Sequence, residues 1–135
     1  MGVIELSEFK KFEDIKAWER AHNLCVSVYR ALEKSREYDF RGHIFKTALS
    51  IPSNIAEGFE RHSSREFVQF LNYAKGSCGE LRAQLYVAKD LDLVESEQVC
   101  KMILEVKEIS SMISGLVRSV RKRMVSGQTK NANRI

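Results

Sequence analysis

The residues of this chain best suited to chemistry are its basic side chains, which are unevenly distributed. Residues 109–135 contain six Lys and Arg and no acid, whereas residues 1–108 contain 16 basic and 18 acidic residues. Basic side chains without neighbouring acids attract phosphate groups and displace the counterions of nucleic acids. The candidate nucleic-acid-binding residues are Arg118, Arg121, Lys122, Arg123, Lys130 and Arg134. Further basic residues scattered through the body are Arg20, Lys46, Arg61, Arg65, Lys75 and Arg82. Cations also suit the last turn of a helix, so a structural role for part of the cluster stays open.

Metal-binding and nucleophilic chemistry find little support in the sequence. The Glu-x-x-His motif of di-metal bundle proteins occurs once, as Glu19 and His22, whereas a two-metal site needs two copies. We expect His22 to be a hydrogen-bonded interior histidine. Cys25, Cys78 and Cys100 have neither disulfide nor metal-ligand spacing, and we expect them to be small buried side chains in a reducing cytoplasm. Without a partnered nucleophile or a phosphate loop, the sequence predicts no catalytic residues, no metal, no cofactor and no enzymatic activity.

The elements that must position the basic residues are helices. Apolar residues recur at alternating steps of three and four, the period of a helix-bundle seam, in four stretches. These stretches cover about residues 14–34, 40–61, 64–89 and 96–124. The pattern predicts an all-α protein, an up-down four-helix bundle over 13–124 with a leader at 1–12 and a disordered tail at 125–135. No apolar run is long enough to span a bilayer, so we expect a cytoplasmic protein with no membrane partner.

The chain has one proline, Pro52, inside a segment that still has the apolar period of a helix. An interior proline removes a backbone hydrogen bond. We predict a continuous, kinked helix, and the alternative is a helix that stops near Ser50 and restarts with Pro52 in its first turn. We also expect residues 76–80 of the third helix to pack closely on residues 53–58 of the second. The polar patch predicted at this contact contains Asn54, Glu57, Ser77 and Glu80.

The Pro52 segment and the residues around Ser77 together resemble the 23S rRNA intervening-sequence proteins, which are small bacterial four-helix bundles. The residues that carry the family motif are Ser50, Pro52, Asn54, Glu57, Gly58, Gly76, Ser77 and Glu80. The resemblance extends over about residues 9–123. That family is in turn similar to the accessory variability determinant of diversity-generating retroelements, a ring-shaped pentamer with a positive surface that works with a reverse transcriptase and nucleic acid. By resemblance, we expect a homo-oligomer, a ring-shaped homopentamer.

Together these observations predict a non-enzymatic oligomer that binds RNA or DNA through basic surface, by charge and shape. The alternative is an oligomeric scaffold for a protein partner such as a reverse transcriptase, with no physiological nucleic-acid binding. Apolar residues outside the main seams are expected to contribute to the contact between copies. They are Phe45, Leu49, Phe70, Tyr73, Val87 and Leu91.

Overall fold

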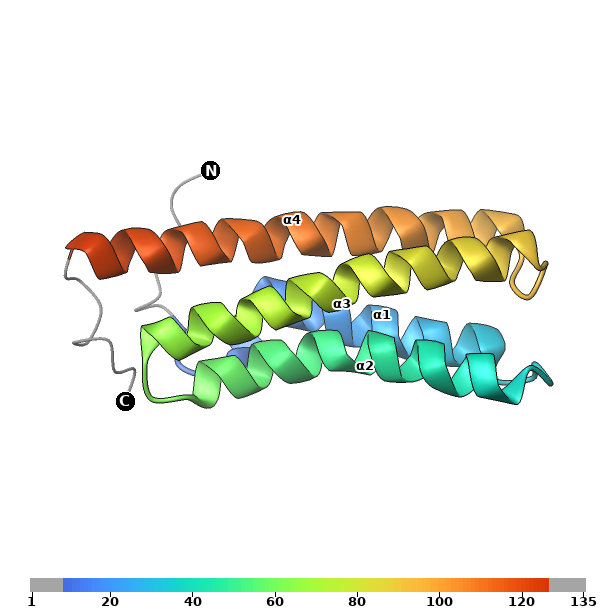
Figure 1. The fold of residues 1–135 in the computed structure, drawn as a ribbon, viewed down its shortest axis with the longest axis horizontal. Helices are drawn as coiled ribbons and strands as arrows, with labels where there is room; N and C mark the ends of the chain where they lie inside the picture. Colours follow the sequence, from blue (N-terminus) through green and yellow to red (C-terminus); the bar gives the residue numbers. More distant parts are fainter. Residues whose placement is uncertain (1–8, 127–135) are drawn as a thin grey trace.

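Four long helices, each antiparallel to the one before it, form an up-down bundle (Figure 1). The computed structural model describes residues 9–126. Its elements are η2 (Phe12–Asp14), α1 (Lys16–Leu32), α2 (Tyr38–Glu60), α3 (Ser64–Asp90) and α4 (Ser96–Ser126). Within 9–126 there is no β-strand, as the predicted all-α fold requires. None of these helices combines the length and the apolar character needed to cross a membrane.

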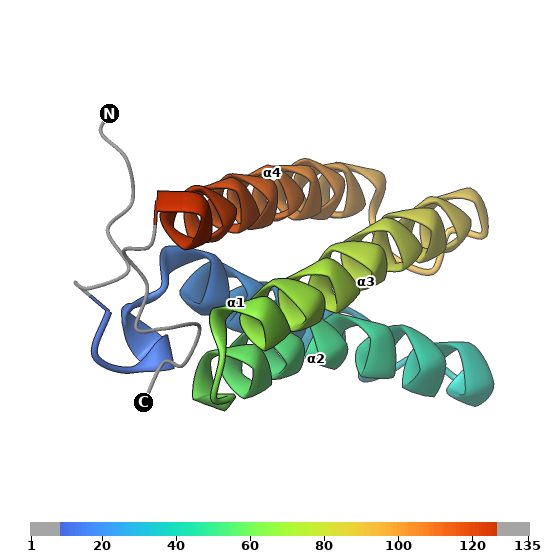
Figure 2. The same cartoon turned by 60° about the vertical axis from the view of Figure 1, so that its left-hand side comes forward.

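The helices form a ring of seams in which α2 with α3, and α3 with α4, make the most extensive contacts. The seam between α1 and α4 has the fewest contacts of the four. An even number of antiparallel helices places the start of α1 and the end of α4 at the same end of the bundle (Figures 1 and 2). The basic end of α4 therefore lies beside the start of the described chain.

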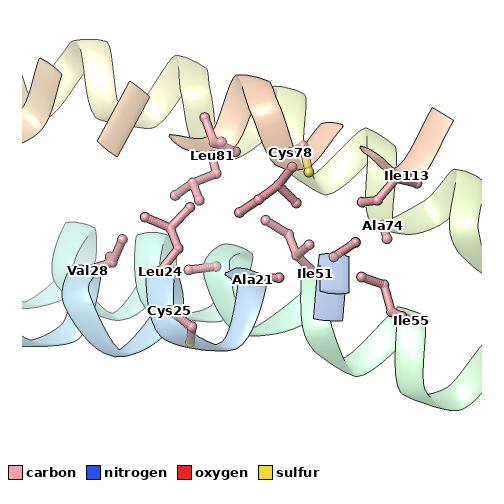
Figure 3. Packing of buried hydrophobic residues seen from close by; sticks show 14 of the residues in the cluster. Ala21, Leu24, Cys25, Val28, Ile51, Ile55, Ala74, Cys78, Leu81 and Ile113 are labelled. Atoms are coloured by element: carbon pink, nitrogen blue, oxygen red, sulfur yellow. The ribbon is translucent and has the colours of Figure 1, made fainter. Parts of the chain in front are cut away.

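The apolar residues that recur at steps of three and four in the third and fourth predicted helices correctly mark the buried faces of α3 and α4. All seven apolar residues of each predicted seam are buried, which the 3.5-residue period explains. In α3 they are Phe67, Leu71, Ala74, Cys78, Leu81, Leu85 and Ala88, and in α4 they are Val99, Met102, Val106, Ile109, Ile113, Leu116 and Val120. Figure 3 shows Leu24 of α1, Ile51 of α2 and Leu81 of α3 pointing into this common core.

The apolar repeat of the first helix predicts a seam that is only partly correct, since Ile15, Cys25 and Leu32 are buried and the other three members are not. Its members are Ile15, Trp18, His22, Cys25, Tyr29 and Leu32. A neighbouring strip predicted from Leu24, Val28 and Ala31 contributes the buried Leu24 and Val28. The buried face contains Ala17, Ala21, Leu24, Cys25 and Val28. The aromatic residues Trp18 and Tyr29 lie at the edges of this face instead. Trp18 packs edge-on against Phe12, with ring centroids 5.1 Å apart, and the half-exposed Tyr29 packs against Phe45 at 5.3 Å. Small alanines, rather than aromatic rings, face the other helices.

Helix α2 is continuous through Pro52, so the alternative of two separate helices is wrong. Short polar side chains bond to backbone carbonyls in the surrounding turns. The Thr47 hydroxyl donates to the His43 carbonyl at 3.1 Å, and the Asn54 amide donates to the Ser50 carbonyl at 2.7 Å. Such local bonds add polar partners in a helix that proline deprives of one ladder bond.

The close contact between α2 and α3 differs from the one predicted. The Ser50 and Ser77 hydroxyls share a hydrogen bond with the two oxygens 2.7 Å apart. Glu57 and Glu80 are not part of one patch, since Glu57 pairs with Arg61 at 3.5 Å and Glu80 pairs with His43 at 3.4 Å. The antiparallel register that aligns Ser50 with Ser77 separates these two carboxylates along the helices.

The glycines expected at this helix contact play different roles. A Cβ added at Gly76 or Gly79 would meet nothing within 4 Å, so close helix packing does not require either glycine. A Cβ added at Gly58 would lie 2.6 Å from Phe70 Cβ and 3.1 Å from Phe67 Cδ1. Gly58 is therefore the residue of the family motif that permits close approach of α2 and α3.

The C-terminal end of the described chain differs from the predicted boundary. At the other end, Phe9 and Phe12 of the predicted leader pack back against the core, as their aromatic side chains suggest. Helix α4 continues to Ser126, so the first two residues of the predicted disordered tail are helical. Residues 127–135 lie outside the described part of the chain.

Candidate nucleic-acid interface

The basic end of α4 forms one exposed surface. Arg118, Arg121 and Lys122 are all exposed, and their spacing of three and four residues places them on one helix face. In the same turns Val117 and Val120 are buried in the core. Their burial orients the helix so that the cations face away from the core. Arg123 is half-buried and is not part of this surface. The remaining candidates, Lys130 and Arg134, lie outside the described residues.

Arg20 is committed to an ion-pair network between α1 and α4. Its Nε donates to Glu105 Oε2 at 2.9 Å, and its Nη2 contacts both Glu105 and Glu108. The hydrogen bonds that Arg20 donates to these two carboxylates raise the pKa of its guanidinium further above its already high value. This arginine acts as a bridge across the least extensive seam and is not available to a phosphate.

Arg61 is similarly committed at the turn between α2 and α3. Its Nε donates to Glu66 Oε1 at 3.0 Å, and its guanidinium lies 5.0 Å from the centre of the Phe70 ring. The Arg61 hydrogen bond lowers the pKa of the Glu66 carboxyl. The Ser63 hydroxyl caps the start of α3, because it accepts from the Glu66 backbone N–H at 3.1 Å, and it also donates to Glu66 Oε2 at 3.2 Å.

The other scattered cations remain exposed, and none has an ion pair within residues 9–126. They are Lys46, Arg65, Lys75 and Arg82. Lys75 and Arg82 line a groove between α3 and α4, where the structure adds Lys107 to them. Lys107 is not among the candidates predicted from the sequence, where Glu105 and Glu108 lie on either side of it. The sequence could not reveal that both acids bind Arg20 of α1.

The predictions for His22 and Cys100 are wrong. His22 is exposed and stacks on Trp18, with ring centroids 5.1 Å apart and an interplanar angle of 23°. Cys25 and Cys78 are buried as expected, but Cys100 is exposed. Burial raises the pKa of the Cys78 thiol to about 12. Within the described residues, no group of three or more His, Cys, Asp or Glu could hold a metal ion.

The comparisons with known proteins identify the chain's relatives. Residues 13–115 match the family described as 23S rRNA-intervening sequence protein. The chain belongs to this family. The comparison with curated proteins gives no match. A similar solved structure is a protein of unknown function from the S23 ribosomal protein family of Bacteroides thetaiotaomicron. It has 20% identity, a TM-score of 0.70, and coverage of 75% of this chain and 97% of that chain, a likeness that shows the fold.

The family match clarifies which features of this intervening-sequence protein are shared and which lie beyond the matched region. The motif residues around Pro52 and Ser77 fall within the match, where they build the contact between α2 and α3. The match ends at Gly115, before the three exposed cations of α4. The basic surface therefore has to be interpreted from its own geometry.

Proposed function

We propose that this protein is a non-enzymatic oligomer that binds RNA or DNA by charge and shape, through the basic end of α4. The observation that carries the proposal is the exposure of Arg118, Arg121 and Lys122 on one face of a helix with no acid after Glu108. Phosphate contacts of this kind give affinity without base recognition.

We further propose that the oligomer is a ring-shaped homopentamer, as the family resemblance suggests. Exposed apolar side chains on α2 and α3 support self-association, because they provide surface that a second copy could bury. Leu49 is 44% exposed, Tyr73 50% and Val87 44%. Several basic helix ends converging in one assembly would strengthen phosphate binding.

The test is the affinity of a labelled hairpin RNA, and of DNA of the same sequence, measured by fluorescence anisotropy between about 50 and 200 mM salt. In the α4-end variant, Arg118, Arg121 and Lys122 are replaced by Gln. Its control replaces Arg30, Lys34 and Arg36, exposed cations at the opposite end of the bundle, and removes the same charge. Shortening α4 would be a poorer test, because it would remove the buried Val117 and Val120.

We expect the α4-end variant to bind at least about tenfold more weakly than the control at low salt. Its salt slope, the slope of log affinity against log salt concentration, should be smaller in magnitude by about two. The oligomer mass of both variants must match that of the unmodified protein. If the unmodified protein binds neither nucleic acid at low salt, the proposal fails. The scaffold alternative, which the exposed apolar residues of α2 and α3 favour, would then be pursued through a protein partner.

A further inference from the structure

A groove of about 340 Å³ lies between α3 and α4, away from the basic end of α4. Its walls come from two turns of each helix. The residues that line it are Lys75, Cys78, Gly79, Arg82, Val106, Lys107, Ser110 and Ser111. Three of the eight are cations and two are hydroxyl donors, whereas none is an acid.

The positive charge of the groove is not neutralised by the surrounding described residues. Lys75, Arg82 and Lys107 are exposed and form no ion pair within residues 9–126. The acids nearest to Lys107 in sequence, Glu105 and Glu108, bind Arg20 on the α1 side of α4. Neither acid lines the groove itself, although Glu108 and Arg20 line a neighbouring hollow together with Lys107 and Ser111.

The shape of the groove depends on small side chains. Gly79 lies on the α3 wall, and a Cβ built there would meet no atom within 4 Å, so the space above the backbone is open. The floor is formed by the buried Cys78 and Val106, which belong to the packed core. An apolar floor beneath exposed cationic side chains provides a concave site that an anion can enter.

The α4 side of the groove continues toward the basic helix end. Lys107, Ser111, Gly115, Arg118 and Lys122 follow one another at steps of four, four, three and four, so they form one stripe. This stripe contains no acid, and its middle residues are small. The distance along the helix from Lys107 to Arg118 is about 16 Å, or several nucleotides of a strand that rises about 3.4 Å per nucleotide.

From this arrangement we infer that the α3–α4 groove is a second phosphate-binding site, in which Lys75, Arg82 and Lys107 hold backbone phosphates of the nucleic acid that also contacts the end of α4. The inference rests on the proposed function and deepens it, because it gives the nucleic acid a path along α4. Ser110 and Ser111 supply hydrogen-bond donors, and the three cations supply charge-assisted bonds.

The test uses the same RNA and DNA probes with a groove variant in which Lys75, Arg82 and Lys107 are replaced by Gln. The control is again the variant of Arg30, Lys34 and Arg36, which removes equal charge elsewhere. We expect the groove variant to bind about tenfold more weakly than this control, and its salt slope to fall by about two. Equal affinities and slopes for the two variants would overturn the inference.

A second pair of variants leaves all the cations in place. Gly79→Glu introduces a negative side chain into the groove, and Gly42→Glu introduces the same charge at an equally open helical glycine of α2. Both changes replace a helical glycine by a better helix former, so neither should unfold the bundle. We expect only Gly79→Glu to weaken binding.

The outcomes separate this inference from the proposed function. If the unmodified protein binds neither probe, both fail. If the α4-end variant loses affinity while the groove variant and Gly79→Glu behave like their controls, the groove inference alone is overturned. Acetylation footprinting gives an independent check, since bound RNA should protect Lys75 and Lys107 but not Lys34.

Discussion

Gly58 faces Phe70 so closely that a Cβ at position 58 would lie 2.6 Å from the Phe70 Cβ. Real Cβ atoms do not approach to this distance, so α2 and α3 can come together here only with glycine on α2. The contact lies beside the turn where Arg61 binds Glu66 and covers the Phe70 ring. The family motif thus includes a steric requirement as well as polar contacts.

We expect Gly58→Ala to lower the free energy of unfolding by about 1–3 kcal/mol, because the added methyl group forces packed atoms apart. Urea unfolding followed by circular dichroism measures this. Gly76→Ala is the control, since its Cβ meets open space and alanine favours a helix interior by about 1 kcal/mol. If Gly58→Ala left the free energy of unfolding unchanged, α2 and α3 would have to be farther apart at this point than the structure shows.

The hydrogen bond between Ser50 and Ser77 should be measurable by a double-mutant cycle. Each single change to Ala is expected to lower the free energy of unfolding by about 0.5–1.5 kcal/mol. The double variant should lose less than the sum, because the two residues share one bond. Strict additivity would show that the hydroxyls do not interact.

The Arg20 bridge should stabilise the seam between α1 and α4. Arg20→Gln is expected to lower the free energy of unfolding by about 1 kcal/mol at low salt and by less at high salt, since the pair is partly solvated. Lys16→Gln removes a more exposed ion pair, with Glu19, and should have a smaller effect. Equal effects of the two substitutions would contradict a bridging role for Arg20.

Thiol reactivity should distinguish the three cysteines. In the native protein at pH 8, a thiol reagent is expected to modify Cys100 rapidly, while Cys25 and Cys78 react only after unfolding. Burial raises the pKa of both buried thiols, and that of Cys78 reaches about 12. Mass spectrometry of the modified peptides identifies the reactive site, and rapid labelling of Cys78 would contradict its placement.

The raised pKa of Cys78 also predicts a pH dependence of stability. An unfolded thiol ionises near its ordinary pKa of about 8.5, whereas the folded thiol stays neutral up to about pH 12. Its contribution is therefore fully present below about pH 8.5 and is lost progressively as the pH rises toward 12. Urea unfolding at pH 7 and pH 10 should show a smaller loss in Cys78→Ala than in the unmodified protein.

If copies of the chain meet through α2 and α3, charged substitutions there should reduce the oligomer mass. Leu49→Glu and Tyr73→Glu are expected to do so in light scattering, because each buries a charge in the contact. Leu104→Glu, at a 60% exposed position on α4, is the matched control. Unchanged mass in all three would exclude the α2–α3 face as the contact.

The sequence predicted α3 and α4 well because each has one unbroken repeat of seven apolar residues, beside which the other buried apolar residues, such as Ile103 and Val117, form only a flank. In α1, two neighbouring apolar strips have the same period and both contribute to the core, whereas the large residues Trp18 and Tyr29 of the predicted seam lie at its edge. The buried face uses Ala17 and Ala21, whose small size gives little signal. Only the packing of three other helices decides between such seams.

The candidate interface was predicted only where charge is contiguous along the chain. The end of α4 is visible because no acid follows Glu108. The groove could not be predicted from the sequence, because Lys75 and Lys107 are far apart along the chain and meet only through the antiparallel arrangement of α3 and α4. The neutralisation of nearby acids by Arg20 is likewise a tertiary effect.

Both ends of the described chain lie at the same end of the bundle, so the chain can be joined there and opened elsewhere without changing how the helices pack. A circular permutant that joins the end of α4 to the start of α1 through a linker, and opens the chain in the exposed turn at Arg36, would retain all four seams. In such a permutant the α1–α4 seam becomes a local hairpin, so the least extensive contact would form early in folding instead of depending on chain closure.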